Sequence, residues 1–186
     1  MEKRVSYLLD IISRYSILII VGALGTGVFY WLFTVLTLYP TYFLLRFFFS
    51  TYLVGSNLIL VNGLPIEIIG ACVAGSAYYL LLILNLSTRE IEIKKRIGLL
   101  LFSCFSFLFI NILRIFFLSI LYVDGFSFFD ITHKLLWYAG SIVFVVGIWF
   151  LGVRIFKIKK VPFYSDILSS LELEKKPKKS KRSKKH

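Results

Sequence analysis

The sequence predicts an all-α integral membrane protein with about four transmembrane helices, an interfacial helix and a small β-hairpin at the outer face. Of the 186 residues, 58% are hydrophobic and 17% are charged, whereas a soluble domain averages about 25% charged residues. The hydrophobic residues gather in runs of about 20, the length that crosses a bilayer. The net charge of +12 comes from basic residues that flank these runs or follow the last one. This distribution is typical of membrane topology and of contact with anionic lipid, so we expect no nucleic-acid partner.

The first apolar run ends at Pro40 and contains about 24 apolar residues, enough to span the membrane. It is too long for the apolar core of a signal peptide, and no small-residue cleavage site follows it. We therefore expect a retained transmembrane helix. Gly22, Gly25 and Gly27 lie within this run and would allow another helix to approach closely.

The next region, 42–61, is hydrophobic but short, and Arg46 lies inside it. Asn62 and Gly63 follow, between two runs of β-branched and aliphatic residues. This pattern is the strongest short signal for a β-hairpin. We therefore expect an interfacial helix and a hairpin here, and no second full span. Arg46 is either an interfacial anchor or a contact for substrate or lipid headgroups.

Three further apolar runs, at 71–87, 97–125 and 135–156, are each predicted to span the membrane. Residues 1–156 are therefore expected to form one membrane-embedded domain. Residues 157–186 are expected to form a basic cytoplasmic tail that is largely disordered, because it ends in a block of like charges.

The positive-inside rule discriminates between two topologies. If 42–61 crossed the membrane, the basic loop from Arg89 to Arg96 and the basic tail would both lie outside. If 42–61 stays at the outer face, both lie in the cytoplasm. We therefore predict a multi-pass protein of the cell membrane with four spans and both termini in the cytoplasm.

This topology brings three reactive residues to the outer face. Cys72 lies at the outer start of the second span, and His133 lies in the outer link before the fourth. Arg114 lies roughly 27 Å along the third helix from Arg96, at the outer end. A thiol becomes a useful nucleophile beside an imidazole that takes its proton, and an arginine can stabilise an oxyanion. A charge within a membrane helix is costly, so we expect Arg114 to have a functional role.

The segments ACVAG with Cys72, NILRI with Asn111 and Arg114, and DITHK with His133 follow one another in this order. In these motifs and their spacing, residues 55–156 resemble the exosortase/archaeosortase family of membrane-embedded cysteine transpeptidases. The resemblance implies that Cys72, Arg114 and His133 are catalytic and that Asn111 supports them. Many members carry a glycine two residues after the cysteine, where this chain has alanine.

The resemblance also implies an activity and partners. Residues 1–156 would form a catalytic domain that cleaves C-terminal sorting signals, each made of a short motif, a transmembrane helix and a basic cluster. The substrates would be exported proteins, and the acceptor of the new C-terminus would be a membrane lipid. The active site would lie at the outer face of the cell membrane. No cofactor or metal is expected, because the two histidines fall outside any zinc-binding spacing.

Each of these residues also has a structural interpretation. Cys72 could be a small packing residue, Arg114 could extend to lipid headgroups, and His133 could be an ordinary interfacial residue. Asn111, one turn before Arg114, could orient the arginine or hydrogen-bond between helices. Asp130 could fix the tautomer of His133 if the link is helical.

Cys104 is interpreted as a packing residue. It lies roughly 12 Å into the third span from Arg96, near the opposite face from Cys72, so the topology excludes a disulfide between the two cysteines. The alternative function is that of a non-enzymatic membrane assembly or transport subunit. In that case Arg114 would pair with a carboxylate of a partner protein.

Overall fold

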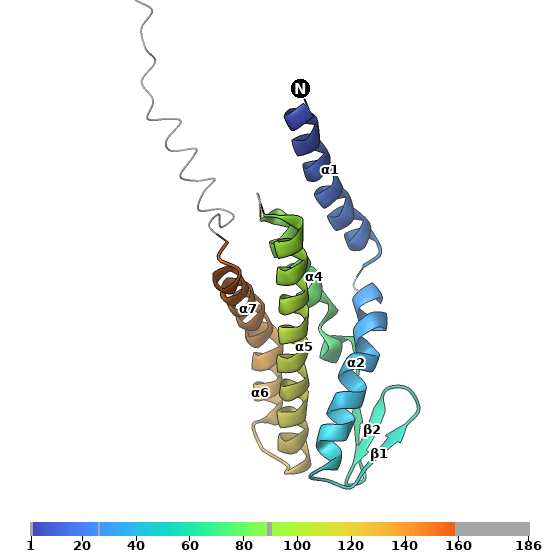
Figure 1. Ribbon diagram of the computed structural model, residues 1–186. Coiled ribbons are helices and arrows are strands. Elements are labelled where there is room, and N and C mark those ends of the chain that lie inside the picture. The colour runs from blue at the N-terminus through green and yellow to red at the C-terminus, as the bar shows by residue number, and fades with distance from the viewer. Residues whose placement is uncertain (1, 26, 89–90, 159–186) are drawn as a thin grey trace, which may run out of the picture.

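The computed structural model describes residues 2–25, 27–88 and 91–158, so the predicted tail 157–186 lies almost entirely outside the described residues. The described chain is mostly helical and carries one small antiparallel sheet (Figure 1). In chain order, its elements are α1 (Glu2–Ala23), α2 (Gly27–Arg46), β1 (Thr51–Val54), β2 (Leu58–Val61), β3 (Leu64–Glu67), α3 (Gly70–Val73), α4 (Gly75–Ser87), α5 (Ile93–Val123), α6 (Phe129–Leu135), the π-helical turn η1 (Leu136–Gly140) and α7 (Ser141–Ile155).

Three helical segments in the described residues are long and apolar enough to cross a membrane. They are Gly70–Ser87, Ile93–Val123 and Phe129–Ile155, and they correspond to the last three predicted spans. These helices thus agree with the apolar composition of the chain, which is typical of a membrane protein. The predicted count of four spans is not confirmed.

The region before the sheet differs from the prediction. The first predicted span is two helices, because the chain breaks at Gly25, whose φ of +71° ends α1. Helix α2 then continues through Pro40 to Arg46. Helices packed among other helices tolerate an internal proline. The separate interfacial helix expected within 42–61 is therefore wrong: the first part of that region ends α2, and the rest forms β1 and β2.

The predicted hairpin at Asn62-Gly63 is confirmed. Both residues have positive φ, 49° and 85°, as the tight turn between β2 and β3 requires. Val61 pairs with Leu64 at its end. The sequence predicted only these two strands. A third strand, β1, pairs with the other side of β2, which gives the order β1-β2-β3. The buried side chain of Ile59 belongs to the face of the sheet that packs into the core.

The helices lie side by side with the sheet at one end of the bundle (Figure 1). The beginning of α1, the end of α4, the beginning of α5 and the end of α7 lie at the opposite end. Helix α5 has 31 residues and is therefore about 46 Å long, longer than a hydrocarbon core of about 30 Å. Aromatic and aliphatic side chains fill the centre of the bundle, among them Tyr78, Leu81, Phe107 and Val145.

Arginines cap the end of α4. Arg14 donates from Nη1 to the carbonyls of Leu86 and Thr88, both at 3.3 Å. Arg96 donates from Nη1 to the carbonyls of Asn85 and Leu86, at 3.0 and 3.3 Å. The last carbonyls of a helix have no partner within it, and a cation is favourable there. These contacts fix the end of α4 that lies far from the sheet.

The substitution Arg96→Met should lower the free energy of unfolding by about 2 kcal/mol, because it removes charged hydrogen bonds from half-buried carbonyls. Thermal unfolding of the purified chain in detergent micelles measures this loss. Lys95→Met is the matched control, since Lys95 makes only an exposed ion pair with Glu92 at 3.3 Å, and a loss below about 0.5 kcal/mol is expected. Equal destabilisation by the two variants would contradict the capping role.

Candidate active site

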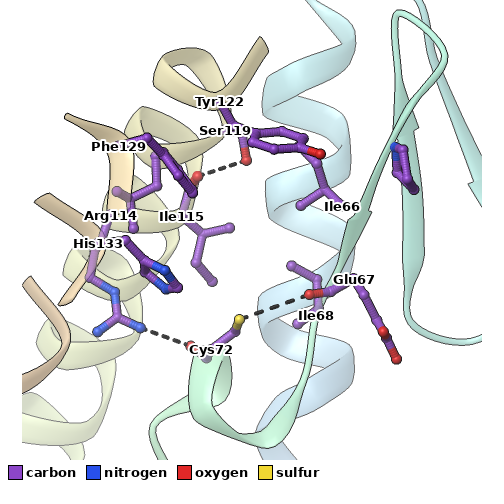
Figure 2. A pocket seen from close by; sticks show the side chains of 12 residues that line it. Ile66, Glu67, Ile68, Cys72, Arg114, Ile115, Ser119, Tyr122, Phe129 and His133 are labelled. Carbon is purple, nitrogen blue, oxygen red and sulfur yellow. Dashed lines mark hydrogen bonds between the residues drawn. The ribbon is translucent and has the colours of Figure 1, made fainter. Parts of the chain in front are cut away.

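One cavity gathers residues from β3, α3, α5 and α6. It has a volume of about 640 Å³, its open mouth included. Cys72, Arg114 and His133 all line it, although they are far apart in the sequence (Figure 2). The remaining lining residues are Pro65, Ile66, Glu67, Ile68, Ile115, Leu118, Ser119, Tyr122 and Phe129. The three residues predicted from the sequence thus meet in a mostly apolar cavity.

Cys72 lies in α3, a single helical turn separated from α4 by a break at Ala74. Ala74 has a left-handed backbone, with φ 58° and ψ 48°, a conformation that costs an L-residue other than glycine about 1–2 kcal/mol. Its N–H donates to the carbonyl of Gly70 at 3.1 Å and closes the turn.

The break leaves the carbonyl of Cys72 to be bound by side chains of α5. Asn111 donates to it from Nδ2 at 2.9 Å, and Arg114 donates to it from Nη2 at 3.2 Å. Arg114 also donates from Nη1 to Ser141 Oγ at 3.2 Å. The Arg114 side chain therefore turns into the bundle and does not extend to headgroups. Asn111 bonds between helices and does not orient Arg114 directly.

The thiol of Cys72 is directed at the sheet. Its Sγ donates to the backbone carbonyl of Glu67 at 3.9 Å, a weak hydrogen bond. Figure 2 shows this bond crossing from α3 to the strand, while the carboxylate of Glu67 points away from the thiol. That carboxylate accepts instead from Asn57 Nδ2 at 2.9 Å. The side chain of Cys72 is half-buried, so the nucleophile is reachable from the cavity.

His133 belongs to α6 and points into the cavity. Its imidazole stacks on Phe129, with ring centroids 5.6 Å apart and planes 26° apart. No hydrogen bond joins the imidazole to the Cys72 thiol in the described part of the chain. Catalytic hydrogen bonds are often made only when a substrate is bound. The geometry therefore places a thiol and an imidazole on two walls of one cavity.

Three other predicted residues lie outside the cavity. Asp130 is exposed in the first turn of α6, where a carboxylate is favourable, and it forms no hydrogen bond or ion pair with His133. Arg46 lies at the end of α2 beside Phe43 and donates to the hydroxyl of Tyr42 at 3.5 Å. Cys104 packs against the core, and both cysteines are free, as expected. No group of three or more metal-binding side chains occurs in residues 2–25, 27–88 and 91–158.

The sequence prediction missed the carbonyl of Glu67 and the hydroxyl of Ser141. A backbone carbonyl gives no signal in the sequence. Ser141 did give one, because it is a polar residue in the apolar run 135–156, where a hydroxyl needs a partner.

Comparisons with known proteins give no relative: no family model, no curated protein and no solved structure matches this chain. The resemblance noted in the sequence therefore stays a prediction. What supports a function is the chemistry of the residues and the way that the fold arranges them.

The left-handed backbone at Ala74 predicts a specific response to substitution. Ala74→Gly should leave the chain at least as stable, whereas Ala74→Val should cost about 2 kcal/mol, because a β-branched side chain is strained at positive φ. Thermal unfolding in micelles measures both. Ala71→Val, in the right-handed turn of α3, is the control. If Ala71→Val and Ala74→Val destabilise the chain equally, backbone strain does not determine which side chains position 74 tolerates.

Proposed function

We propose that this chain is a membrane cysteine protease or transpeptidase that cleaves C-terminal sorting signals of exported proteins and transfers the new C-terminus to a membrane lipid. The observation that carries the proposal is the single cavity lined by Cys72, Arg114 and His133. A thiol, an imidazole and a guanidinium are the side chains that acyl transfer through a thioester requires. All three lie in helical segments that are long and apolar enough to cross a membrane.

The position of the cavity along the bundle supports an active site at the outer face. Four spans are proposed, namely α2, α3 with α4, α5, and α6 with α7. Helix α2 has 20 residues and is about 30 Å long, enough to cross. Lys94, Lys95, Arg154 and Lys157 lie at the end of the bundle opposite the sheet, which the positive-inside rule assigns to the cytoplasm. Arg114 is then about 27 Å from that face, near the outer edge of the hydrocarbon core.

In the proposed first step, Cys72 turns from the Glu67 carbonyl and passes its proton to the imidazole of His133. The thiolate sulfur attacks the scissile carbonyl of the substrate, and a carbon–sulfur bond forms. The carbon–nitrogen bond then breaks, and the imidazolium returns its proton to the leaving amine. The product is a thioester between Cys72 and the new C-terminus of the exported protein.

In the second step, an amine or hydroxyl of a lipid headgroup attacks the thioester. His133 takes the proton of this nucleophile and returns it to the sulfur as the thiol leaves. Attack by water gives hydrolysis instead. The chemistry of both steps needs only the side chains of this chain and the two substrates.

Arg114 is assigned first to positioning. Two of its three nitrogens hold the Cys72 carbonyl and Ser141, while its Nε is buried and has no hydrogen-bond partner among the described residues. Its positive charge beside the nucleophile stabilises the developing oxyanion. The alternative, a non-enzymatic subunit, requires Arg114 for a partner's carboxylate. These intramolecular bonds make that use less favourable.

The first test replaces Cys72 by alanine in the cells that make this protein. At least one exported protein should then keep its C-terminal transmembrane segment, because the nucleophile that opens the peptide bond is missing. Mass spectrometry of the C-termini of membrane-associated exported proteins measures the effect. Cys104→Ala is the control and should process normally. Identical C-termini in both variants would rule out the proposed activity.

The second test is chemical labelling of the intact cells with a membrane-impermeant maleimide. Cys72 should be modified from the outside, because its thiol is half-buried and opens into the cavity. Cys104 should remain unmodified, since it lies towards the cytoplasmic end of α5. Mass spectrometry of the two single-cysteine variants distinguishes the sites. A Cys72 that does not react would favour the non-enzymatic subunit. Labelling of Cys104 alone from the outside would show that the topology is the reverse of the one proposed.

A further inference from the structure

Strand β3 is an edge strand that faces the cavity. The sheet has the order β1-β2-β3, so within the described residues β3 has a strand on one side only. Residues 65–68, from the strand and its end, line the cavity together with Cys72 and His133. The free edge of a strand presents unpaired N–H and C=O groups that can pair with another chain. Here that edge forms the wall beside the nucleophile.

The register of the sheet identifies which groups point into the cavity. The N–H of Ile68 donates to the carbonyl of Asn57 at 2.7 Å, and Ile66 pairs with Ile59. Backbone groups alternate in direction along an antiparallel strand, so residues 64, 66 and 68 bond to β2. The backbone groups of Pro65 and Glu67 therefore point away from β2.

Two independent features agree with this alternation. The carbonyl of Glu67 accepts the thiol of Cys72, which it can do only if it faces the cavity. Pro65 has no N–H, and proline is tolerated on a strand where the N–H would face away from the partner strand. The free edge thus offers an N–H and a carbonyl at Glu67 and a carbonyl at Pro65.

We propose that an extended segment of the substrate adds to the free edge of β3 as a fourth strand and so brings its scissile carbonyl to Cys72. This inference rests on the function proposed above and specifies how its substrate is held. The N–H of Glu67 donates to a substrate carbonyl, and the carbonyls of Pro65 and Glu67 accept substrate N–H groups. In strand addition, main-chain hydrogen bonds supply affinity and pockets for alternate side chains supply specificity.

The rest of the cavity fits such an occupant. A peptide bond must be extended and accessible to be attacked, and Ile115 and Tyr122 of α5 lie across from β3 (Figure 2). After β3 the chain continues through α3 and α4 towards the arginine-capped end of the bundle. A substrate that enters the membrane from outside runs in the same direction, so the added strand is parallel to β3.

Strand addition also affects the nucleophile. The Cys72 thiol and an incoming substrate N–H use the same carbonyl of Glu67. A substrate that takes this carbonyl releases the thiol, which can then turn towards His133. Binding of an extended peptide and activation of the nucleophile are thereby coupled.

The test uses tetraalanyl chloromethyl ketone, an extended peptide whose end alkylates a thiol with loss of chloride. The purified full chain in micelles is compared as the variants Glu67→Pro and Glu67→Ala. Both lose the carboxylate and its bond to Asn57, but only proline removes the N–H that faces the cavity. The rate at which the peptide alkylates Cys72, measured by mass spectrometry, should be at least tenfold lower in Glu67→Pro than in Glu67→Ala. Iodoacetamide, which makes no strand contacts, should alkylate the two variants at rates within about twofold.

A second measurement leaves the protein unchanged and so does not depend on how Glu67→Pro folds. Two isomers of the peptide carry N-methyl groups on alternate amides. Only one isomer should lose tenfold or more in alkylation rate, because only every second N–H of an added strand faces β3. Equal rates for the two isomers, or equal rates for the two Glu67 variants, would overturn strand addition. Normal processing in Cys72→Ala cells would instead overturn the proposed function. The difference in alkylation rate between the two N-methylated isomers would then remain.

Discussion

The carbonyl of Cys72 is the group on which the rest of the site depends. A backbone carbonyl without a partner is costly inside a membrane protein, and the break at Ala74 removes the helical partner that this one would have had. Asn111 and Arg114 replace it from α5. The same arginine reaches Ser141 at the start of α7. One carbonyl that the helix leaves without a partner therefore ties α3, α5 and α7 together at the level of Cys72.

The break also determines where the sheet lies. Because α4 has only 13 residues, it runs beside only part of α5, and the sheet lies at the end of the bundle that α4 does not reach (Figure 1). The strands take that place, and β3 leads directly into α3. The cavity is what remains between the sheet and α5. A shortened, broken span is thus the reason that the thiol faces open space and is not buried in a helix interface.

The π turn at Leu136–Gly140 has a matching role on the other wall. His133 and Ser141 are eight residues apart, which in a regular α-helix places them about 80° apart around the axis. A π turn accommodates about one extra residue, so the two side chains return to nearly the same face. His133 can then line the cavity while Ser141 meets Arg114. π-helical turns are frequent at functional sites for this reason.

Signals that are local along the chain carried the successful sequence predictions. The turn at Asn62-Gly63 depends on two backbone angles, and the meeting of Cys72, Arg114 and His133 depends on where charges flank apolar runs. The missed features are non-local. The strand β1 depends on its pairing with β2. The position of Asp130 on the exposed side of α6 depends on how that helix is turned, which its seven residues do not specify.

The depth of the cavity also bears on which acceptor resolves the proposed thioester. In the proposed topology, Arg114 lies about 27 Å from the cytoplasmic face, and its bond to the Cys72 carbonyl would place the thiol close to the level of the outer headgroups in a hydrocarbon core of about 30 Å. A headgroup amine or hydroxyl confined to that layer reaches the sulfur at high local concentration. The apolar lining of Ile115, Leu118 and Phe129 disfavours ordered water at the same atom. If the proposed function holds, this arrangement favours transfer to lipid over hydrolysis.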